Sequence, residues 1–113
     1  MKSSASGVFV LQDAAAANGD GAPFTMDSFE KLAIQITGTY SAKVHIEATM
    51  DGINWVEIAA TDLGSTSPTT KTKTINSTAG LYAVDLLGGF TSVRTRVSDY
   101  ASGAVTVRVN GHN

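Results

Sequence analysis

Apolar and polar positions alternate with a period of two along most of the chain. Every second residue is apolar from Leu32 to Ile36, and the same holds from Ala42 to Ala48. A period of two places successive apolar side chains on one face of a strand. Because the turn-forming residues 38–41 separate the two segments, we expect them to be adjacent strands of one antiparallel pair.

Further short strands are expected along the rest of the chain, and no segment carries a helical stripe. Their expected ranges are residues 7–12, 55–58, 70–75, 81–87, 92–98 and 104–109. Short strands separated by turn residues predict an all-β fold, an antiparallel two-sheet β-sandwich with either a jelly-roll or an immunoglobulin-like topology.

The length and composition fit one domain over residues 1–113. Residues 1–22 are nearly uncharged and rich in Ala, Gly and Ser, so they are interpreted as an N-terminal arm that orders on a partner, with a loop over 13–23. The apolar stretch near the N-terminus is too short for a signal peptide. No stretch is long enough to span a membrane.

The charge and cysteine content exclude several functional classes. The chain has no cysteine, a net charge of −2 and only 16% charged residues, against a usual value of about 25%. Disulfide scaffolds and thiol nucleophiles are therefore excluded, and general nucleic-acid binding is not expected.

Groups suited to catalysis or metal binding are scarce. His45 falls on the polar side of its expected strand, so we expect a solvated residue, and His112 lies next to the C-terminus. No nucleophile, phosphate-binding or dinucleotide motif is present, so we predict no enzyme and no cofactor. A calcium site from Asp13, Asn18 and Asp20 is the alternative to a solvated loop, but the EF-hand order is missing.

Three arginines, Arg94, Arg96 and Arg108, lie in the last two expected strands. If these strands are neighbours in one sheet, the three side chains project from the same face. They would then meet an acidic partner or, as we favour, form a solvated face paired within the chain. The acidic residues expected to pair with them are Asp85, Asp99 and Glu57.

The segment 49–58 contains the most distinctive local sequence. Asp51 is suited to bond the backbone two residues on, Gly52 to adopt a positive φ, and Trp55 to anchor the returning strand. This set is expected to be a structural turn. The functional alternative is an aromatic platform for sugars, in which Trp55 would be joined by Tyr40, Tyr82 or Tyr100.

This hairpin, together with the Arg-x-Arg strand and the Ser-Gly-x-Val-x-Val ending near residues 94–107, resembles small structural proteins of tailed bacteriophages over about residues 32–109. The resemblance implies a virion component, which we expect to be a capsid decoration or cementing protein rather than a tail or fibre module. It would be made in the host cytoplasm and bind the major capsid protein on the outer surface of the head. The same hairpin also resembles carbohydrate-binding sandwiches, so binding to surface glycans is kept as the alternative.

The segment 81–87 is apolar on both faces, which is typical of a central strand or of one covered by another subunit. We therefore expect a homo-oligomer, a dimer or a trimer. The candidate interface residues are Val8, Phe9, Leu11, Leu81, Ala83, Leu87, Arg94, Arg96 and Arg108.

Overall fold

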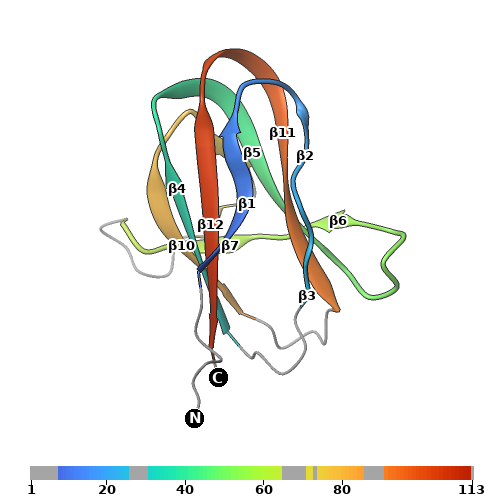
Figure 1. Ribbon diagram of the computed structural model, residues 1–113. Coiled ribbons are helices and arrows are strands. Elements are labelled where there is room, and N and C mark those ends of the chain that lie inside the picture. Colours follow the sequence, from blue (N-terminus) through green and yellow to red (C-terminus); the bar gives the residue numbers. More distant parts are fainter. Residues whose placement is uncertain (1–7, 26–30, 65–70, 73, 86–90, 113) are drawn as a thin grey trace.

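The protein consists of two antiparallel β-sheets packed face to face, as the computed structural model in Figure 1 shows. The structure describes residues 8–25, 31–64, 71–72, 74–85 and 91–112. The predicted all-β, antiparallel two-sheet sandwich is confirmed. Within the described ranges no helix has the length and apolar character needed to cross a membrane.

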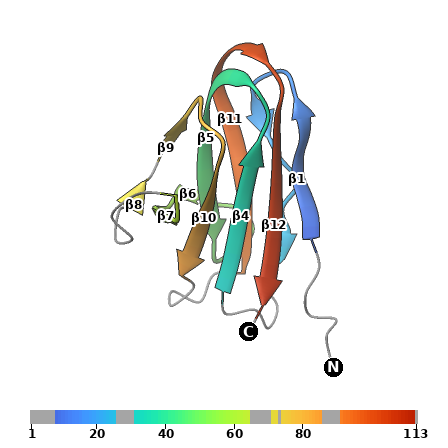
Figure 2. The ribbon, with the colours of Figure 1, turned by 90° about the vertical axis from the view of Figure 1, so that its left-hand side faces the viewer.

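Among the described residues, six strands form each sheet. Sheet A contains, in spatial order, β1 (Val8–Ala15), β12 (Val105–His112), β4 (Lys31–Thr37), β10 (Gly80–Asp85), β7 (Ala60–Asp62) and β8 (Lys71–Thr72). Sheet B contains β2 (Gly19–Asp20), β11 (Ser92–Gly103), β5 (Tyr40–Thr49) and β6 (Val56–Glu57), with β3 (Phe24–Thr25) paired to β11 and β9 (Thr74–Asn76) paired to β5. Figure 2 shows β10, β4, β12 and β1 side by side, with β5 and β11 behind them.

The core lies between the sheets and is built by the period-two apolar positions. Ile34 on β4 and Val107 on β12 face Val44 and Ile46 of β5, and each of the four is fully buried. Burying a side chain of this size stabilises the fold by about 1.5–3 kcal/mol. The alternation therefore identifies the inward face of each long strand.

The expected pairing of segments 32–36 and 42–48 is wrong, because β4 belongs to sheet A and β5 to sheet B. The chain crosses between the sheets at Gly38, where φ is 113°. It crosses back at Gly103, where φ is 83°, so β11 and β12 also lie in different sheets. Alternation shows which face of a strand is apolar, and the same face can be buried by a crossing as well as by a hairpin.

The two crossings pack against each other at one end of the sandwich. A Cβ atom on Gly38 would clash with the carbonyl oxygen of Ala104, and one on Gly103 would clash with the carbonyl oxygen of Thr39. The backbone N–H of Ala104 donates to that Thr39 oxygen at 3.2 Å. Glycine is therefore needed at both positions for close backbone approach as well as for positive φ.

The N-terminal segment does not form the expected arm from Val8 onward. Strand β1 pairs with β12, with Val8 opposite Asn110, and the expected loop over 13–23 contains the end of β1 and the short strand β2. Residues 1–7 of the expected arm lie outside the described residues. Pairing with β12 satisfies backbone hydrogen bonds of β1 and buries Leu11, while Val8, Phe9 and Val10 stay exposed.

The crossing predicts that alanine substitution costs different amounts of stability at two glycines that both have positive φ. A Cβ atom on Gly52 would meet nothing within 4 Å, so Gly52→Ala should cost about 1–2 kcal/mol from backbone strain alone. Gly103→Ala adds the clash with Thr39 and should cost about 3 kcal/mol or more. Denaturant unfolding of both variants measures the difference, and equal costs would contradict this account of the crossing.

Candidate functional site

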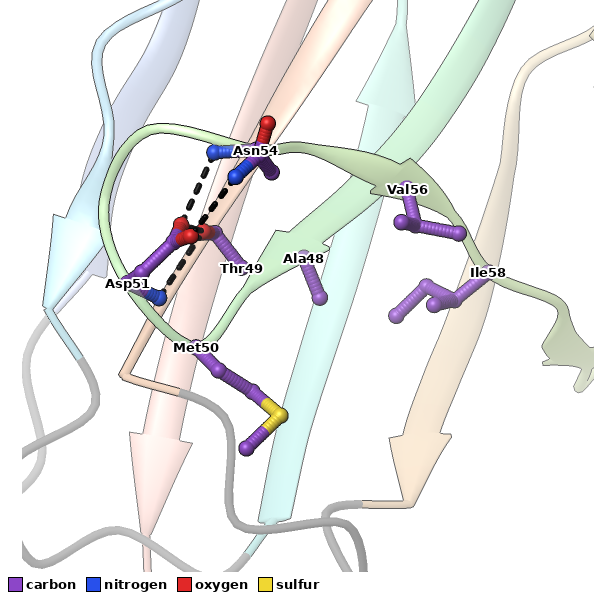
Figure 3. A pocket seen from close by; sticks show the side chains of 7 residues that line it. All are labelled: Ala48, Thr49, Met50, Asp51, Asn54, Val56 and Ile58. Atoms are coloured by element: carbon purple, nitrogen blue, oxygen red, sulfur yellow. Dashed lines mark hydrogen bonds between the residues drawn. The ribbon is translucent and has the colours of Figure 1, made fainter.

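The hairpin between β5 and β6 is held by one carboxylate. Asp51 Oδ1 accepts hydrogen bonds from the backbone N–H groups of Ile53 and Asn54, both at 2.8 Å, and from the Thr49 hydroxyl at 2.9 Å. Asp51 Oδ2 accepts from the Asn54 side-chain amide at 2.8 Å (Figure 3). These bonds, the two backbone ones first, hold the pKa of Asp51 well below its usual range. Gly52 follows with φ of 78°.

A shallow apolar hollow of about 310 Å³ lies beside this turn (Figure 3). Met50, Ile53 and Val56 around the turn are 71%, 79% and 65% exposed. The Asp51 carboxylate is already saturated by donors of its own loop, so the hollow offers contact with an apolar group rather than acid–base chemistry. The lining residues are Ala48, Thr49, Met50, Asp51, Asn54, Val56 and Ile58.

Trp55 precedes β6, is half-buried and has a cation over its ring. The Arg94 Cζ atom lies 4.3 Å from the centre of its ring, in a cation–π contact. Of the tyrosines expected to extend a sugar platform, Tyr40 and Tyr82 are 8% and 4% exposed and belong to the core. Tyr100 is half-buried and donates its hydroxyl to Gly103 O at 2.7 Å. The tyrosines therefore do not form an exposed platform with Trp55.

The outer face of sheet B carries a network of charges centred on Glu47. Its Oε1 accepts from Arg94 Nε at 2.9 Å and its Oε2 from Arg96 Nε at 3.0 Å, while Arg94 Nη1 lies 3.4 Å from Asp20. Burial would raise the pKa of Glu47, but the hydrogen bonds and charges of the two arginines outweigh it, so its pKa lies below the usual value. The positive charge of this face is therefore neutralised within the molecule.

The expected stripe of three arginines on one face is wrong, because Arg108 lies on β12 in sheet A. There its Nη1 contacts the Thr37 hydroxyl at 3.4 Å. The crossing at Gly103 separates the strands that carry the arginines. Asp99, an expected partner of the arginines, pairs instead with Lys43 at 3.0 Å.

His45 is not the solvated residue expected from the sequence, since it is only 8% exposed. Its Nδ1 lies 2.9 Å from Glu57 Oε2 and its Nε2 lies 2.6 Å from Ser98 Oγ. Glu57 Oε2 also accepts from the Thr74 hydroxyl at 2.8 Å. Long polar side chains from neighbouring strands cover this outward-facing histidine, and strand alternation carries no signal for that.

The residues of the alternative calcium site have other partners. Asn18 Oδ1 accepts the backbone N–H of Tyr100 at 2.9 Å, and Asp20 pairs with Arg94. Asp13 is exposed. Among the described residues no group of three or more potential ligands is placed to hold a metal ion.

The outer face of sheet A carries a second hollow, whose lining holds little charge. This hollow has a volume of about 320 Å³ and is lined by one charged residue, Arg108. Leu81 and Val8 there are 44% and 64% exposed, and the buried Asn110 Oδ1 has no hydrogen-bond partner within the described part of the chain. Uncharged, partly apolar sheet faces are typical of surfaces that contact another molecule. The lining residues are Val8, Ala33, Gln35, Leu81, Arg108, Val109 and Asn110.

The remaining candidate interface residues are distributed differently. Leu11 is 3% exposed and belongs to the core, so its expected interface role is wrong. Phe9 lies at the β1 edge, half exposed, with its ring centroid 5.2 Å from that of Phe24. Ala83 is half-buried on β10, while Leu87 lies outside the described residues.

The Glu47 network predicts both a stability loss and its pH dependence. Glu47→Gln leaves two arginines without their shared countercharge, so the free energy of unfolding at pH 7 should fall by about 1–3 kcal/mol. Because the folded-state pKa of Glu47 is lowered, its stabilisation is fully present above the ordinary value and is lost as the pH falls through the folded value. The gap between wild type and variant should therefore narrow in acid.

Urea unfolding at several pH values measures this gap. Asp99→Asn, which weakens the exposed pair with Lys43, serves as the control and should have a smaller effect at pH 7. A gap that stays constant from neutral pH to strong acid would contradict the assignment to Glu47.

Comparison with known proteins identifies the fold and the family. The structure of the SPBc2 prophage-derived protein YomS matches with a TM-score of 0.84 and 20% identity, covering 94% of this chain and 91% of that one. The PBSX exported protein XepA also matches with a TM-score of 0.84, at 18% identity, but this chain spans only 37% of its length. No curated protein sequence matches the chain. The family described as XepA matches over residues 6–111, and the chain therefore belongs to the XepA family.

Proposed function

We propose that the chain is a phage structural protein that binds another protein surface through the outer face of sheet A. The observation that carries this proposal is the contrast between the paired charges on sheet B and the lining of the hollow on sheet A. Sheet B has its charges paired within the molecule around Glu47, whereas the hollow on sheet A is lined by apolar and uncharged residues with the single cation Arg108. A surface of the second kind loses little hydration energy when it is covered.

The unpaired Asn110 Oδ1 supports the same face. A buried acceptor without a partner costs about 1–3 kcal/mol, and rotation of the Asn110 side chain toward a donor of a docked molecule would recover part of that cost. Arg108 beside it offers a charge for an acidic group. The partner surface that fits this hollow is therefore apolar, with at least one hydrogen-bond donor and one carboxylate.

The phage association is supported by the relatives. YomS is described as prophage-derived, and the chain shares its fold over nearly the full length of both. Within this setting we propose capsid decoration, with the major capsid protein as the partner and the outer capsid surface as the location. The exposed β1 edge, with Val8, Phe9 and Val10 between 46% and 64% exposed, is proposed to contact a second copy in a dimer or trimer.

The proposal predicts that one added charge on the sheet A face weakens binding. Leu81→Glu places a carboxylate in the hollow and should weaken binding to undecorated capsids by about 30-fold or more, since a central apolar contact contributes about 2 kcal/mol. Ile53→Glu is the matched control, because Ile53 is also an exposed apolar residue but lies on the hairpin.

Purified variants mixed with undecorated capsids and measured by co-sedimentation test this prediction. Equal binding by both variants and the wild type would show that sheet A is not the docking face. Absence of wild-type binding would remove the capsid proposal, and light scattering of the isolated protein tests the second copy.

A second candidate is glycan binding outside the producing cell, which two observations favour. XepA is described as an exported protein, and Trp55 of this chain is only half-buried. One indole face stacked on a sugar contributes about 1 kcal/mol or more. Trp55→Ala should therefore remove any signal on an array of bacterial surface glycans, while Leu81→Glu should leave it unchanged. An array that stays blank with wild-type protein would end this candidate.

A further inference from the structure

Three side chains on the outer face of sheet B form a continuous hydrogen-bonded chain. Ser98 Oγ lies 2.6 Å from His45 Nε2, and His45 Nδ1 lies 2.9 Å from Glu57 Oε2. The residues come from β11, β5 and β6, which are hydrogen-bonded neighbours (Figure 1). This is the order of contacts found in serine hydrolases, in which a hydroxyl, an imidazole and a carboxylate act together.

When His45 is neutral, its partners set the direction of each hydrogen bond. An ionised carboxylate only accepts, so the Nδ1 atom of neutral His45 carries the proton and donates a hydrogen bond to Glu57. The Nε2 atom is then the acceptor and takes its hydrogen bond from the Ser98 hydroxyl. A histidine in this tautomer is ready to remove the hydroxyl proton, and Glu57 stabilises the imidazolium that results.

Hydrogen bonding, burial and a strand irregularity fix the positions of these three side chains. Thr74 on β9 donates to Glu57 at 2.8 Å and fixes that carboxylate. His45 is 8% exposed, so its ring has little freedom to rotate. The pairing of β11 with β5 becomes irregular directly after Ser98, and Asp99 has a φ of 51°. Bulges of this kind often lie next to active sites, where they redirect a side chain.

Two cations flank the hydroxyl. Lys43 is the cross-strand partner of Ser98, and Arg96 lies two residues earlier on the same strand and the same face. Arg96 has a side chain that is 37% exposed and uses its Nε for Glu47. Each cation already has an anionic partner, Asp99 for Lys43 and Glu47 for Arg96, so a negative charge that forms next to Ser98 would share their positive charge with these carboxylates.

We infer that Ser98 is an activated nucleophile, with His45 as its general base and Glu57 as the positioning residue, and that this site hydrolyses short-chain acyl esters. Neither of the two hollows described above includes these residues. A site on an open sheet face offers no enclosed room for a long acyl chain, so small groups such as acetyl fit best. The inference does not rest on the proposed docking function.

The reaction balances without any added cofactor. Ser98 Oγ bonds to the carbonyl carbon of the ester while its proton passes to His45 Nε2. The carbon–oxygen bond to the alcohol then breaks, and the alcohol leaves with that proton. Water attacks the acyl-serine, gives one proton to His45, and the proton returns to Ser98 as the carboxylic acid departs. One ester and one water yield one acid and one alcohol.

Cysteine probes test the site cleanly because the chain contains no cysteine. In Ser98→Cys the imidazole of His45 should favour the thiolate form of the new cysteine. Iodoacetamide should then alkylate Ser98→Cys about tenfold or more faster than Ser102→Cys near pH 6.5. Ser102→Cys is the matched control on the same strand. Ser102 is exposed while Ser98 is half-buried, so accessibility alone predicts the opposite order.

Wild-type protein is tested in parallel with a fluorophosphonate and with p-nitrophenyl acetate. We expect one covalent adduct, located at Ser98 by peptide mass analysis, retained in Ser102→Ala and lost in Ser98→Ala, with Glu57→Gln slowing the labelling. Hydrolysis of p-nitrophenyl octanoate should be slower than that of the acetate. Melting curves confirm that each variant is folded.

A slower or equal rate for Ser98→Cys, together with no adduct on the wild type, would overturn the inference. The hydrogen-bonded chain would then be a structural link between strands. This result would leave capsid binding through sheet A unaffected, so the failures of the two proposals are distinguishable.

Discussion

The fold depends on the close contact between two backbone crossings at one end of the sandwich. At Gly38 and Gly103 the chain leaves one sheet for the other, and each crossing meets a carbonyl oxygen of the other where a side chain would stand. The hydrogen bond from Ala104 to Thr39 joins them. Strands β4 and β11 end at this contact, and β5 and β12 begin there. The contact therefore fixes which strands pair and which face each other across the core.

The same crossings separate the surface chemistry of the protein into two faces. Arg94 and Arg96 lie on the sheet B side, where Glu47 neutralises them, and Arg108 lies on the sheet A side. If β11 and β12 formed a hairpin, the three arginines would share one face and repel one another. Instead, one face holds the polar network around Glu47, and the other carries a hollow lined by a single charged residue, Arg108.

The sequence predicts the fold class and the inward residues well, because alternation reports directly on burial. Ile34, Val44 and Val107 are all in the core as expected. It does not predict which strands are neighbours, since a turn and a crossing both require the same flexible residues. The sequence does not predict the cluster of Ser98, His45 and Glu57 for a related reason. Its members lie 12 and 53 positions from the histidine, and only strand pairing brings them together.

The pairing of β1 with β12 places the two ends of the described chain side by side, with Val8 opposite Asn110. Adjacent ends allow a domain to be inserted into a loop of another protein, or to be circularly permuted, without stretching either connection. XepA, of which this chain spans 37%, is a protein in which such a unit is one part of a longer chain. The fold is therefore suited to serve as a transferable building block.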